Sequence, residues 1–156
     1  SLIDPDHRLF YSPGVMPAKI VEFCRNTNQK IPGSQGEMVP CILESLALKY
    51  RMALEGLETV VGHSLEAVHI VGGGSLNRML NQFTANATGK PVLTGPVEAT
   101  ALGNLLVQLM ALGEVGNLEQ ARMLVGRSVA IIEYTPKGTD KWNEVYQRFT
   151  KLVQGA

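Results

Sequence analysis

The residues with the clearest potential for chemistry lie in the segment HIVGGGSLNRML, from His69 to Leu80. The preceding apolar residues are typical of a short buried strand, and three consecutive glycines follow it. Glycine lets a ligand approach the main chain, and the first turn of a helix offers unpaired N–H groups and the positive end of its dipole. A strand, a glycine turn and a helix in this order would suit a nucleotide or another anionic ligand. Apolar residues at helical spacing predict the helix: Leu76, Met79, Leu80 and Phe83.

Two well-known phosphate-binding motifs are incomplete here. Gly72 and Gly74 match the start of the dinucleotide motif G-x-G-x-x-G, but Asn77 stands where the third glycine belongs. A Walker A loop ending at Gly89 and Lys90 would need a glycine at Thr84, five residues before Gly89, and a Ser or Thr at Pro91, and neither is present. A dinucleotide-dependent oxidoreductase remains an alternative, although the acidic residue expected about 20 positions further on is missing too. A tight turn without any ligand is the structural alternative.

Composition limits the classes of protein to consider. The chain has 156 residues, 45% of them hydrophobic, with 14 basic and 14 acidic residues, which fits a single domain with a substantial core. Balanced charge argues against nucleic acid or a membrane surface as a partner. Because no apolar run approaches the roughly 20 residues that cross a bilayer, we expect a cytoplasmic protein. Cys24 and Cys41 are predicted to be buried free thiols, and the three histidines lack the spacing of a zinc site.

Helical periodicity covers much of the chain on both sides of the glycines. Residues 1–14 are expected to be an irregular lead-in. Pro40 does not fit the start of the long helix, and Gly103 is expected to pack closely against a neighbour that offsets its low helix propensity. The predicted helices run from Pro17 to near Asn28, from a capping box at Ser34 and Glu37 to Gly62, from the glycine turn to Gly89, from just after Pro96 to Gly113, from Asn117 to about Val125, and from Thr139 or Asp140 onward.

The strands are few. Residues 68–71 and 91–95 are predicted strands, whereas residues 129–134 fit either a strand or an extended return segment. Strands that alternate with helices indicate a parallel sheet. Two such strands among about six helices make a thin sheet against the usual 5 to 6 strands, so we expect sheet partners to be missing from this chain.

Three longer blocks carry a family resemblance. The segments from His69 to Val115, from Cys41 to Arg51 (CILESLALKYR) and from Trp142 to Phe149 (WNEVYQRF) resemble the C-terminal part of the FGGY carbohydrate kinases, and the rhamnulokinase subfamily most. The resemblance extends over nearly the whole chain. It implies an α/β fold: a partial actin-like, ribonuclease-H-like ATPase domain, helix-rich, with a short and incomplete parallel sheet. Residues 1–156 would then be one domain, the nucleotide-binding portion of such a kinase.

The resemblance also implies an activity. Kinases of this family transfer phosphate from ATP, with Mg²⁺, to a sugar, here to the 1-hydroxyl of a ketose, with L-rhamnulose expected first. Their N-terminal domain holds the sugar and the catalytic base, and the C-terminal domain holds the nucleotide. This chain would lack that N-terminal domain, the catalytic base and the Mg²⁺ site, so we assign it no catalytic residue and expect no sugar phosphorylation by the chain alone. Glu98 is not assigned a catalytic role.

The family's adenosine-binding turn falls on Gly72, Gly73, Gly74 and Ser75, with Asn77 where a side chain approaches the adenine. Missing side chains leave room for a base and a ribose, and an amide can both donate and accept hydrogen bonds at a heteroaromatic edge. Two further hypotheses stay open. The chain could bind nucleotide without catalysis, or it could self-associate through the unpaired edge of its short sheet.

Overall fold

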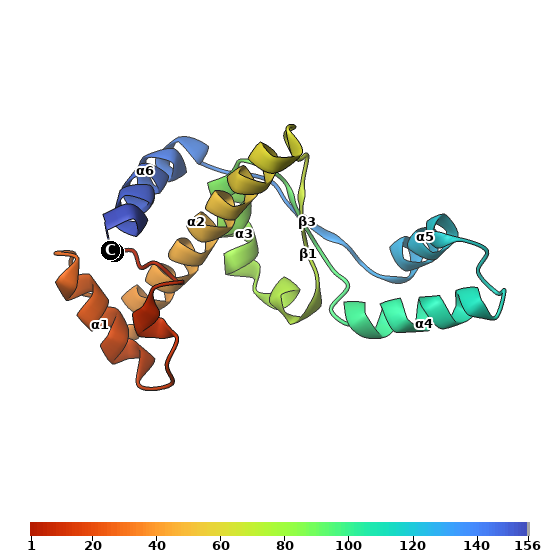
Figure 1. Cartoon of the computed structure of the whole chain (residues 1–156), viewed down its shortest axis with the longest axis horizontal. Helices are drawn as coiled ribbons and strands as arrows, with labels where there is room; N and C mark the ends of the chain where they lie inside the picture. The colour runs from red at the N-terminus through yellow and green to blue at the C-terminus, as the bar shows by residue number, and fades with distance from the viewer. Residues whose placement is uncertain (156) are drawn as a thin grey trace.

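Amphipathic helices make up most of the molecule, and a small sheet lies between two groups of them (Figure 1). The computed structural model describes residues 1–155. Its elements are η1 (Arg8–Phe10), α1 (Met16–Asn26), α2 (Gln35–Val61), β1 (Val68–Ile70), η2 (Gly72–Leu76), α3 (Arg78–Thr88), β2 (Val92–Thr94), α4 (Ala99–Ala111), α5 (Leu118–Ser128), β3 (Ile132–Tyr134) and α6 (Thr139–Gly155), where η marks a 3₁₀ helix.

The sheet has the strand order β1-β2-β3. β1 and β2 run parallel, with Val68 opposite Val92, which confirms the predicted parallel pair. Residues 132–134 do form a strand, and it pairs antiparallel to β2, with Ile132 opposite Thr94. The sheet is therefore mixed rather than wholly parallel, because the chain leaves β2 and returns to the same end of the sheet through α4 and α5.

The main core lies where α2, α3 and α6 meet. α3 packs on both α2 and β2, and α6 packs across α2 and α3. The apolar stripe predicted for the last helix is confirmed, since it faces this core with Phe149 fully buried. The buried members of the cluster are Leu2, Ala47, Leu48, Leu80, Ala87, Tyr146 and Phe149.

Apart from η1, residues 1–14 form the irregular lead-in that the sequence predicts, but the first of them pack into the core. Leu2 and Ile3 are buried, and the Ile3 N–H donates to the Ser45 hydroxyl over 2.9 Å. Ile3 joins a second core cluster with α1 and the start of α2, and this cluster contains both Cys24 and Cys41. The two cysteines are buried free thiols, as predicted.

The capping residues predicted at the two ends of the long helix are confirmed, except that one hydrogen bond of the capping box has a different partner. The Ser34 hydroxyl accepts from the Glu37 N–H over 3.3 Å, so Ser34 is the N-cap of α2. The Glu37 carboxylate reaches back to the Gly33 N–H over 2.7 Å rather than to that of Ser34, so the capping box closes one residue early. Pro40 lies inside α2, and Gly62 ends it as predicted.

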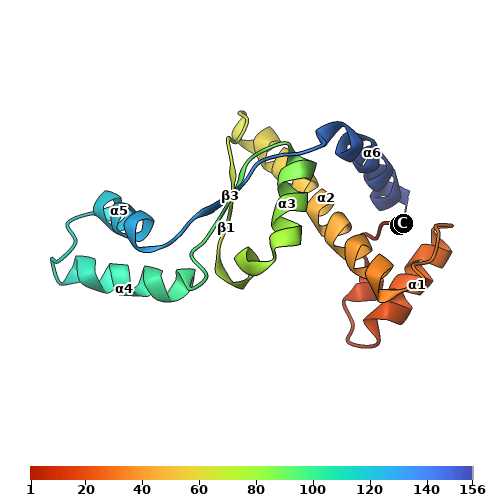
Figure 2. The ribbon, with the colours of Figure 1, turned by 180° about the vertical axis from the view of Figure 1, so that it is seen from behind.

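The pair α4 and α5 projects away from the rest of the molecule, as the two opposite views show (Figures 1 and 2). No residue of α4 is buried, and Leu105 is 51% exposed. The expectation that Gly103 packs closely against a neighbour is wrong, because a Cβ built there meets no atom within 4 Å. α5 extends three residues beyond the predicted end at Val125.

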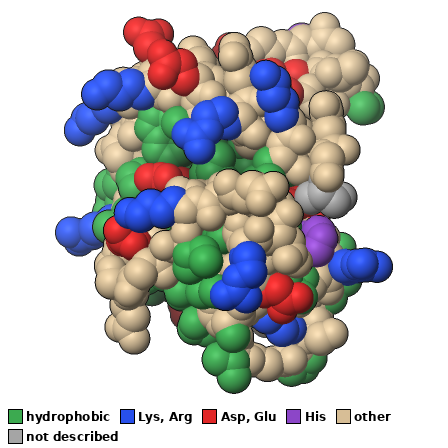
Figure 3. Space-filling view, turned by 90° about the vertical axis from the view of Figure 1, so that its left-hand side faces the viewer, with side chains coloured by type: hydrophobic (Ala, Val, Ile, Leu, Met, Phe, Trp, Pro, Cys, Tyr) green, Lys and Arg blue, Asp and Glu red, His purple; other side chains and the backbone are tan. Residues whose placement is uncertain are grey.

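Charges of both signs are interspersed on the face that Figure 3 shows, at the end of the molecule formed by α1 and α6. This distribution agrees with the balance of 14 basic and 14 acidic residues in the sequence. Within residues 1–155, no helix combines the length and the apolar character needed to span a membrane.

Candidate functional site

The glycine segment forms a turn of its own between β1 and α3. Gly72–Leu76 is a 3₁₀ helix, and α3 begins only at Arg78, after the non-helical Asn77 with φ −82° and ψ 85°. Sequence periodicity had placed Leu76 in the helix, and this part of the prediction is wrong. Leu76 is 67% exposed, because the break at Asn77 takes it off the apolar face of α3.

Glycine is needed for different reasons along this turn. Gly72 has φ 74°, a left-handed conformation that side chains disfavour, and its N–H donates to the Pro96 carbonyl over 2.9 Å. Gly73 and Gly74 do not have positive φ. A Cβ at Gly73 would meet nothing within 4 Å, and one at Gly74 would meet only the Ile70 Cγ2 at 3.8 Å. The fold therefore requires glycine at 72, whereas the space over 73 and 74 is left open.

Two side chains stabilise the turn by hydrogen bonds on its buried side. The Ser75 hydroxyl, which is buried, donates to the Gly72 carbonyl over 2.6 Å. The Asn81 amide donates to the Ser75 carbonyl over 2.8 Å. Sequence reasoning missed Asn81, although an amide next to Leu80, on the apolar face of a predicted helix, was a visible signal.

Asn77 is exposed and serves as the N-cap of α3. Its Oδ1 accepts from the Leu80 N–H over 3.1 Å. Its Nδ2 has no hydrogen bond to any part of the chain that the structure describes. The structure thus brings together all five predicted residues, Gly72, Gly73, Gly74, Ser75 and Asn77, and leaves one amide donor of Asn77 available at the surface.

The segment that follows β2 also stabilises the turn, through main-chain hydrogen bonds. The Gly95 N–H donates to the Ile70 carbonyl over 3.0 Å, and the next carbonyl, that of Pro96, accepts from Gly72. Gly95 has φ 122°, and a Cβ there would lie 3.1 Å from the Ala130 carbonyl oxygen, so both conformation and space require glycine. Glu98 is the exposed N-cap residue of α4 and makes no side-chain capping bond.

A largely apolar cavity of about 550 Å³ lies beside this segment, between the sheet and the pair α4 and α5. Val71 and Pro96, which flank the glycine turn, lie in its wall, but the three glycines do not. The other lining residues are His69, Gly95, Gly103, Leu106, Val107, Met110, Leu118, Ala121, Arg122, Val125, Gly126 and Ile131.

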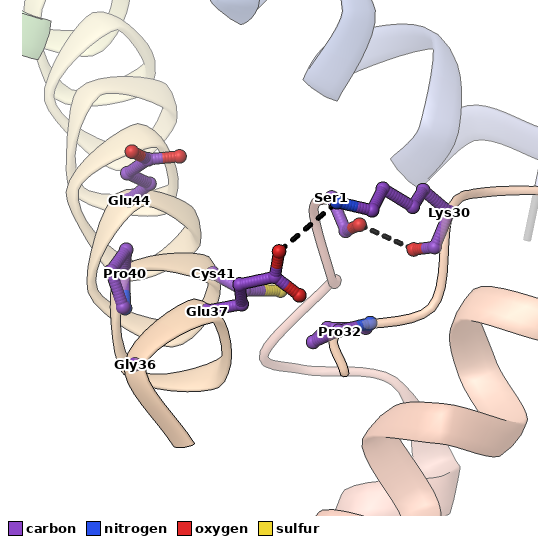
Figure 4. Close-up of a pocket in the computed structure, with 8 residues that line it drawn as sticks. All are labelled: Ser1, Lys30, Pro32, Gly36, Glu37, Pro40, Cys41 and Glu44. Atoms are coloured by element: carbon purple, nitrogen blue, oxygen red, sulfur yellow. Dashed lines mark hydrogen bonds and ion pairs between the residues drawn. The ribbon is translucent and has the colours of Figure 1, made fainter. Parts of the chain in front are cut away.

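A second pocket, of about 300 Å³, lies at the start of α2 and contains Cys41 (Figure 4). Its charged rim is the ion pair of Lys30 and Glu37, with Nζ and Oε1 3.0 Å apart. Burial raises the pKa of the Cys41 thiol to about 11, so the thiol stays protonated at neutral pH and is a poor nucleophile. The pocket thus combines a surface ion pair with an inert cysteine, which does not amount to a catalytic arrangement.

The acidic and sulfur side chains do not gather into a metal-binding cluster. Among residues 1–155, no group of three or more His, Cys, Asp or Glu side chains is placed to hold an ion.

Comparisons with known sequences identify the family of the chain. The family model described as the C-terminal domain of the FGGY family of carbohydrate kinases matches residues 1–112, which include the whole turn. The chain is 45% identical over 154 residues to a rhamnulokinase of Bacteroides thetaiotaomicron and 42% identical over 151 residues to one of Bacillus subtilis. These matches cover 99% and 97% of this chain, but 32% and 31% of the two relatives. The chain thus spans about a third of the length of these curated relatives.

Solved structures show the same fold. A xylulose kinase from Rhodospirillum rubrum superposes with a TM-score of 0.60 at 20% identity, over 80% of this chain and 25% of that one. A gluconate kinase from Lactobacillus acidophilus gives 0.56 at 16% identity, over 95% and 35%. Both are sugar kinases with the actin-like ATPase fold, which agrees with the predicted fold class. The chain belongs to the FGGY family of carbohydrate kinases, and its residues 1–112 match the family's C-terminal domain.

Proposed function

We propose that this chain is the adenosine-binding part of a cytoplasmic, ATP-dependent sugar kinase whose substrate is a ketose, L-rhamnulose first. The identity of 45% and 42% to two rhamnulokinases supports the choice of sugar. We further propose that residues 1–156 form one domain and that a separate N-terminal domain binds the sugar and supplies the base.

The open space over Gly73 and Gly74 carries the proposal. Neither residue has positive φ, and a Cβ at either position would meet no atom closer than 3.8 Å. The fold itself would therefore accept alanine at both positions. Two glycines that the backbone does not need, on an exposed turn, are explained by a ligand that lies against the main chain.

Asn77 supplies the directional contact. Its Oδ1 is fixed by the Leu80 N–H over 3.1 Å, which orients the amide plane. The free Nδ2 then donates toward a ring nitrogen of adenine, because the ring nitrogens of the base are acceptors. Ser75 turns its hydroxyl inward to the Gly72 carbonyl and so acts on the shape of the turn rather than on the nucleotide.

Phosphoryl transfer also needs a positioned hydroxyl, a base to take its proton, and Mg²⁺ to neutralise the phosphates. We assign only the adenosine side of the reaction to this chain, and among residues 1–155 no group of three or more His, Cys, Asp or Glu side chains is placed to hold a metal ion. We therefore expect the purified chain to bind ATP and ADP and to leave L-rhamnulose unphosphorylated. ATP-dependent turnover of L-rhamnulose by this chain would contradict the proposal that a separate domain binds the sugar and supplies the base.

Calorimetric titration with ADP tests the site. We expect the unchanged chain to bind and Gly74→Asp to abolish binding, because its carboxylate fills the open space and repels the phosphates. Gly56→Asp is the matched control: an added Cβ at Gly56 meets no atom within 4 Å, one at Gly74 meets only the Ile70 Cγ2 at 3.8 Å, and Gly56 lies on α2 away from the turn. Equal affinity in the unchanged chain and in Gly74→Asp would refute the site.

We also propose that copies of the chain self-associate through the sheet. β1 lies at one end of the strand order, so only one of its edges is paired within residues 1–155. Unpaired strand edges invite another strand. Exposed apolar side chains on α4, such as Leu105 and Val107, add surface that association would cover. Sedimentation equilibrium should show a concentration-dependent rise in mass, and a monomer at all concentrations would refute this proposal.

A further inference from the structure

Asn81 connects the core of α3 to the glycine turn through two hydrogen bonds in series. Its Nδ2 donates to the Ser75 carbonyl over 2.8 Å, and the Ser75 hydroxyl donates to the Gly72 carbonyl over 2.6 Å. The Asn81 side chain has no exposed surface, so it lies beneath the turn rather than on its ligand side. The peptide conformations of the turn thus depend on one buried amide.

That amide imposes a cost on the fold. The Asn81 Oδ1 is buried and has no hydrogen-bond partner among the described residues. A buried acceptor without a donor costs folding free energy, whereas an apolar side chain of similar size would fill the same volume without that penalty. Packing alone would therefore favour leucine at this position. Positions that break a local rule in this way concentrate at functional sites.

We propose that Asn81 is a positioning residue of the nucleotide site, which keeps the Ser75 peptide oriented so that Gly73 and Gly74 present their open side to adenosine. The inference rests on the proposed function, and it assigns to α3 a residue that never touches the ligand. Ser75 is the intermediate in this arrangement, because it accepts from Asn81 and donates to Gly72.

The test uses two substitutions and one control in the full chain, with ADP as the probe. Asn81→Leu removes the unpaired Oδ1, but it also leaves the Ser75 carbonyl without its donor. Thr84→Val removes another fully buried polar group of α3, whose hydroxyl donates to the Leu80 carbonyl of the same helix and not to the turn. We expect Asn81→Leu to weaken ADP binding about tenfold with a melting temperature close to that of the unchanged chain, because the unpaired Ser75 carbonyl replaces the unpaired Asn81 Oδ1, and we expect Thr84→Val to bind within about twofold of the unchanged chain.

Asn81→Asp should make ADP affinity depend on pH, an effect that a change in packing alone would not produce. In its ionised form this carboxylate would face the Ser75 carbonyl without a proton to donate, so binding should be weak at the alkaline end of a titration from about pH 9 to about pH 5. Burial raises the pKa of such a carboxyl, so as the pH falls through this interval the protonated group donates O–H to Ser75. Relative to the unchanged chain at each pH, we expect Asn81→Asp to recover its affinity and Asn81→Leu to remain weak. If the leucine variant fails to fold, this pH profile decides alone.

Amide NMR spectra keep the inference separate from the proposed function. We expect the Gly73 and Gly74 amide resonances to shift in Asn81→Leu but not in Thr84→Val, with or without ADP. If the unchanged chain does not bind ADP, the proposed function fails, and these shifts still decide whether Asn81 positions the turn. Unshifted glycine resonances, or an Asn81→Leu chain that binds ADP like the unchanged chain, would overturn the inference.

Discussion

The Lys90 ammonium lies 2.9 Å from the Glu58 carboxylate and so connects the last turns of α2 to the segment that leads into β2. The same carboxylate oxygen accepts from the Leu65 N–H over 2.7 Å. The hydrogen bond from Lys90, followed by that from Leu65, lowers the pKa of Glu58 to about 2. Glu58 therefore anchors the loop that enters β1 as well as the turn before β2.

A pH dependence of stability follows from this carboxylate. Folding favours the ionised form, because the folded pKa of about 2 lies below the ordinary value of 4.5. Its contribution to the free energy of unfolding is thus fully present above about pH 4.5 and is lost as the pH falls toward about 2. Urea titrations of Glu58→Gln should show lower stability than the unchanged chain at pH 7, with a difference that shrinks over that interval. Glu66→Gln, in the same loop, is the control, because it leaves the contacts of Glu58 with Lys90 and Leu65 in place.

The N-cap and the adenosine contact of Asn77 can be separated by substitution. Asn77→Ala should lower the free energy of unfolding by about 1 kcal/mol, because the Leu80 N–H loses its acceptor. Asn77→Ser keeps a capping oxygen but has no amide, so it should unfold like the unchanged chain and bind ADP as weakly as the alanine variant. Thermal melts and calorimetry on the same samples measure both effects. Full ADP affinity in Asn77→Ser would show that the amide does not reach the base.

The three glycines should respond differently to alanine. Gly72→Ala should destabilise the chain, because φ 74° is strained for a residue with a side chain. Gly73→Ala should fold as well as the unchanged chain, since its Cβ would meet nothing within 4 Å, yet it should weaken ADP binding by occupying the ligand's space. Chemical denaturation and ADP titration distinguish the two. Loss of stability in Gly73→Ala would mean that this glycine serves the fold.

The main core should depend strongly on the last helix. Phe149 has no exposed surface and lies in the cluster of α2, α3 and α6, so Phe149→Ala should cost about 3–5 kcal/mol of unfolding free energy. Leu105→Ala on α4 should cost far less, because that side chain is 51% exposed. Urea unfolding of both variants provides the comparison. Similar losses would show that α4 is packed more tightly than its exposure indicates.

Gly103→Ala should stabilise α4. An added Cβ meets no atom within 4 Å, and alanine favours a helix interior by about 1 kcal/mol over glycine. Circular dichroism should show an unchanged or higher helix content and a higher melting temperature. A lower melting temperature would instead support the expectation from the sequence that Gly103 packs closely against a neighbour.

The sequence predicted the elements well wherever the determinants are local. Ser34 and Asn117 each cap a helix as their side chains suggest, and Gly62 and Gly89 end helices where apolar periodicity stops. The strand pair β1 and β2 followed from a repeated strand-helix pattern. These features depend on neighbours a few residues apart, so periodicity and capping chemistry suffice.

Features that depend on distant neighbours were not predictable in the same way. The antiparallel pairing of Ile132 with Thr94 depends on how α4 and α5 return the chain, which no local pattern encodes. Gly103 was expected to be packed, but its surroundings are open. At the candidate site, the family resemblance indicated the residues of the turn itself, residues 72–75 and Asn77. The buried support from Asn81 appears only when the hydrogen bonds are seen.

Residues 95–131 leave the sheet at Thr94 and rejoin it at the paired Ile132, so topologically they are the long loop of a β-hairpin. The outgoing connection begins with Gly95 and Pro96, whose main-chain groups bond to Ile70 and Gly72. A change in the orientation of α4 and α5 relative to the sheet would act on the Gly72 N–H, because that group donates to the Pro96 carbonyl. The position of these two helices is thus coupled to the conformation of the glycine turn.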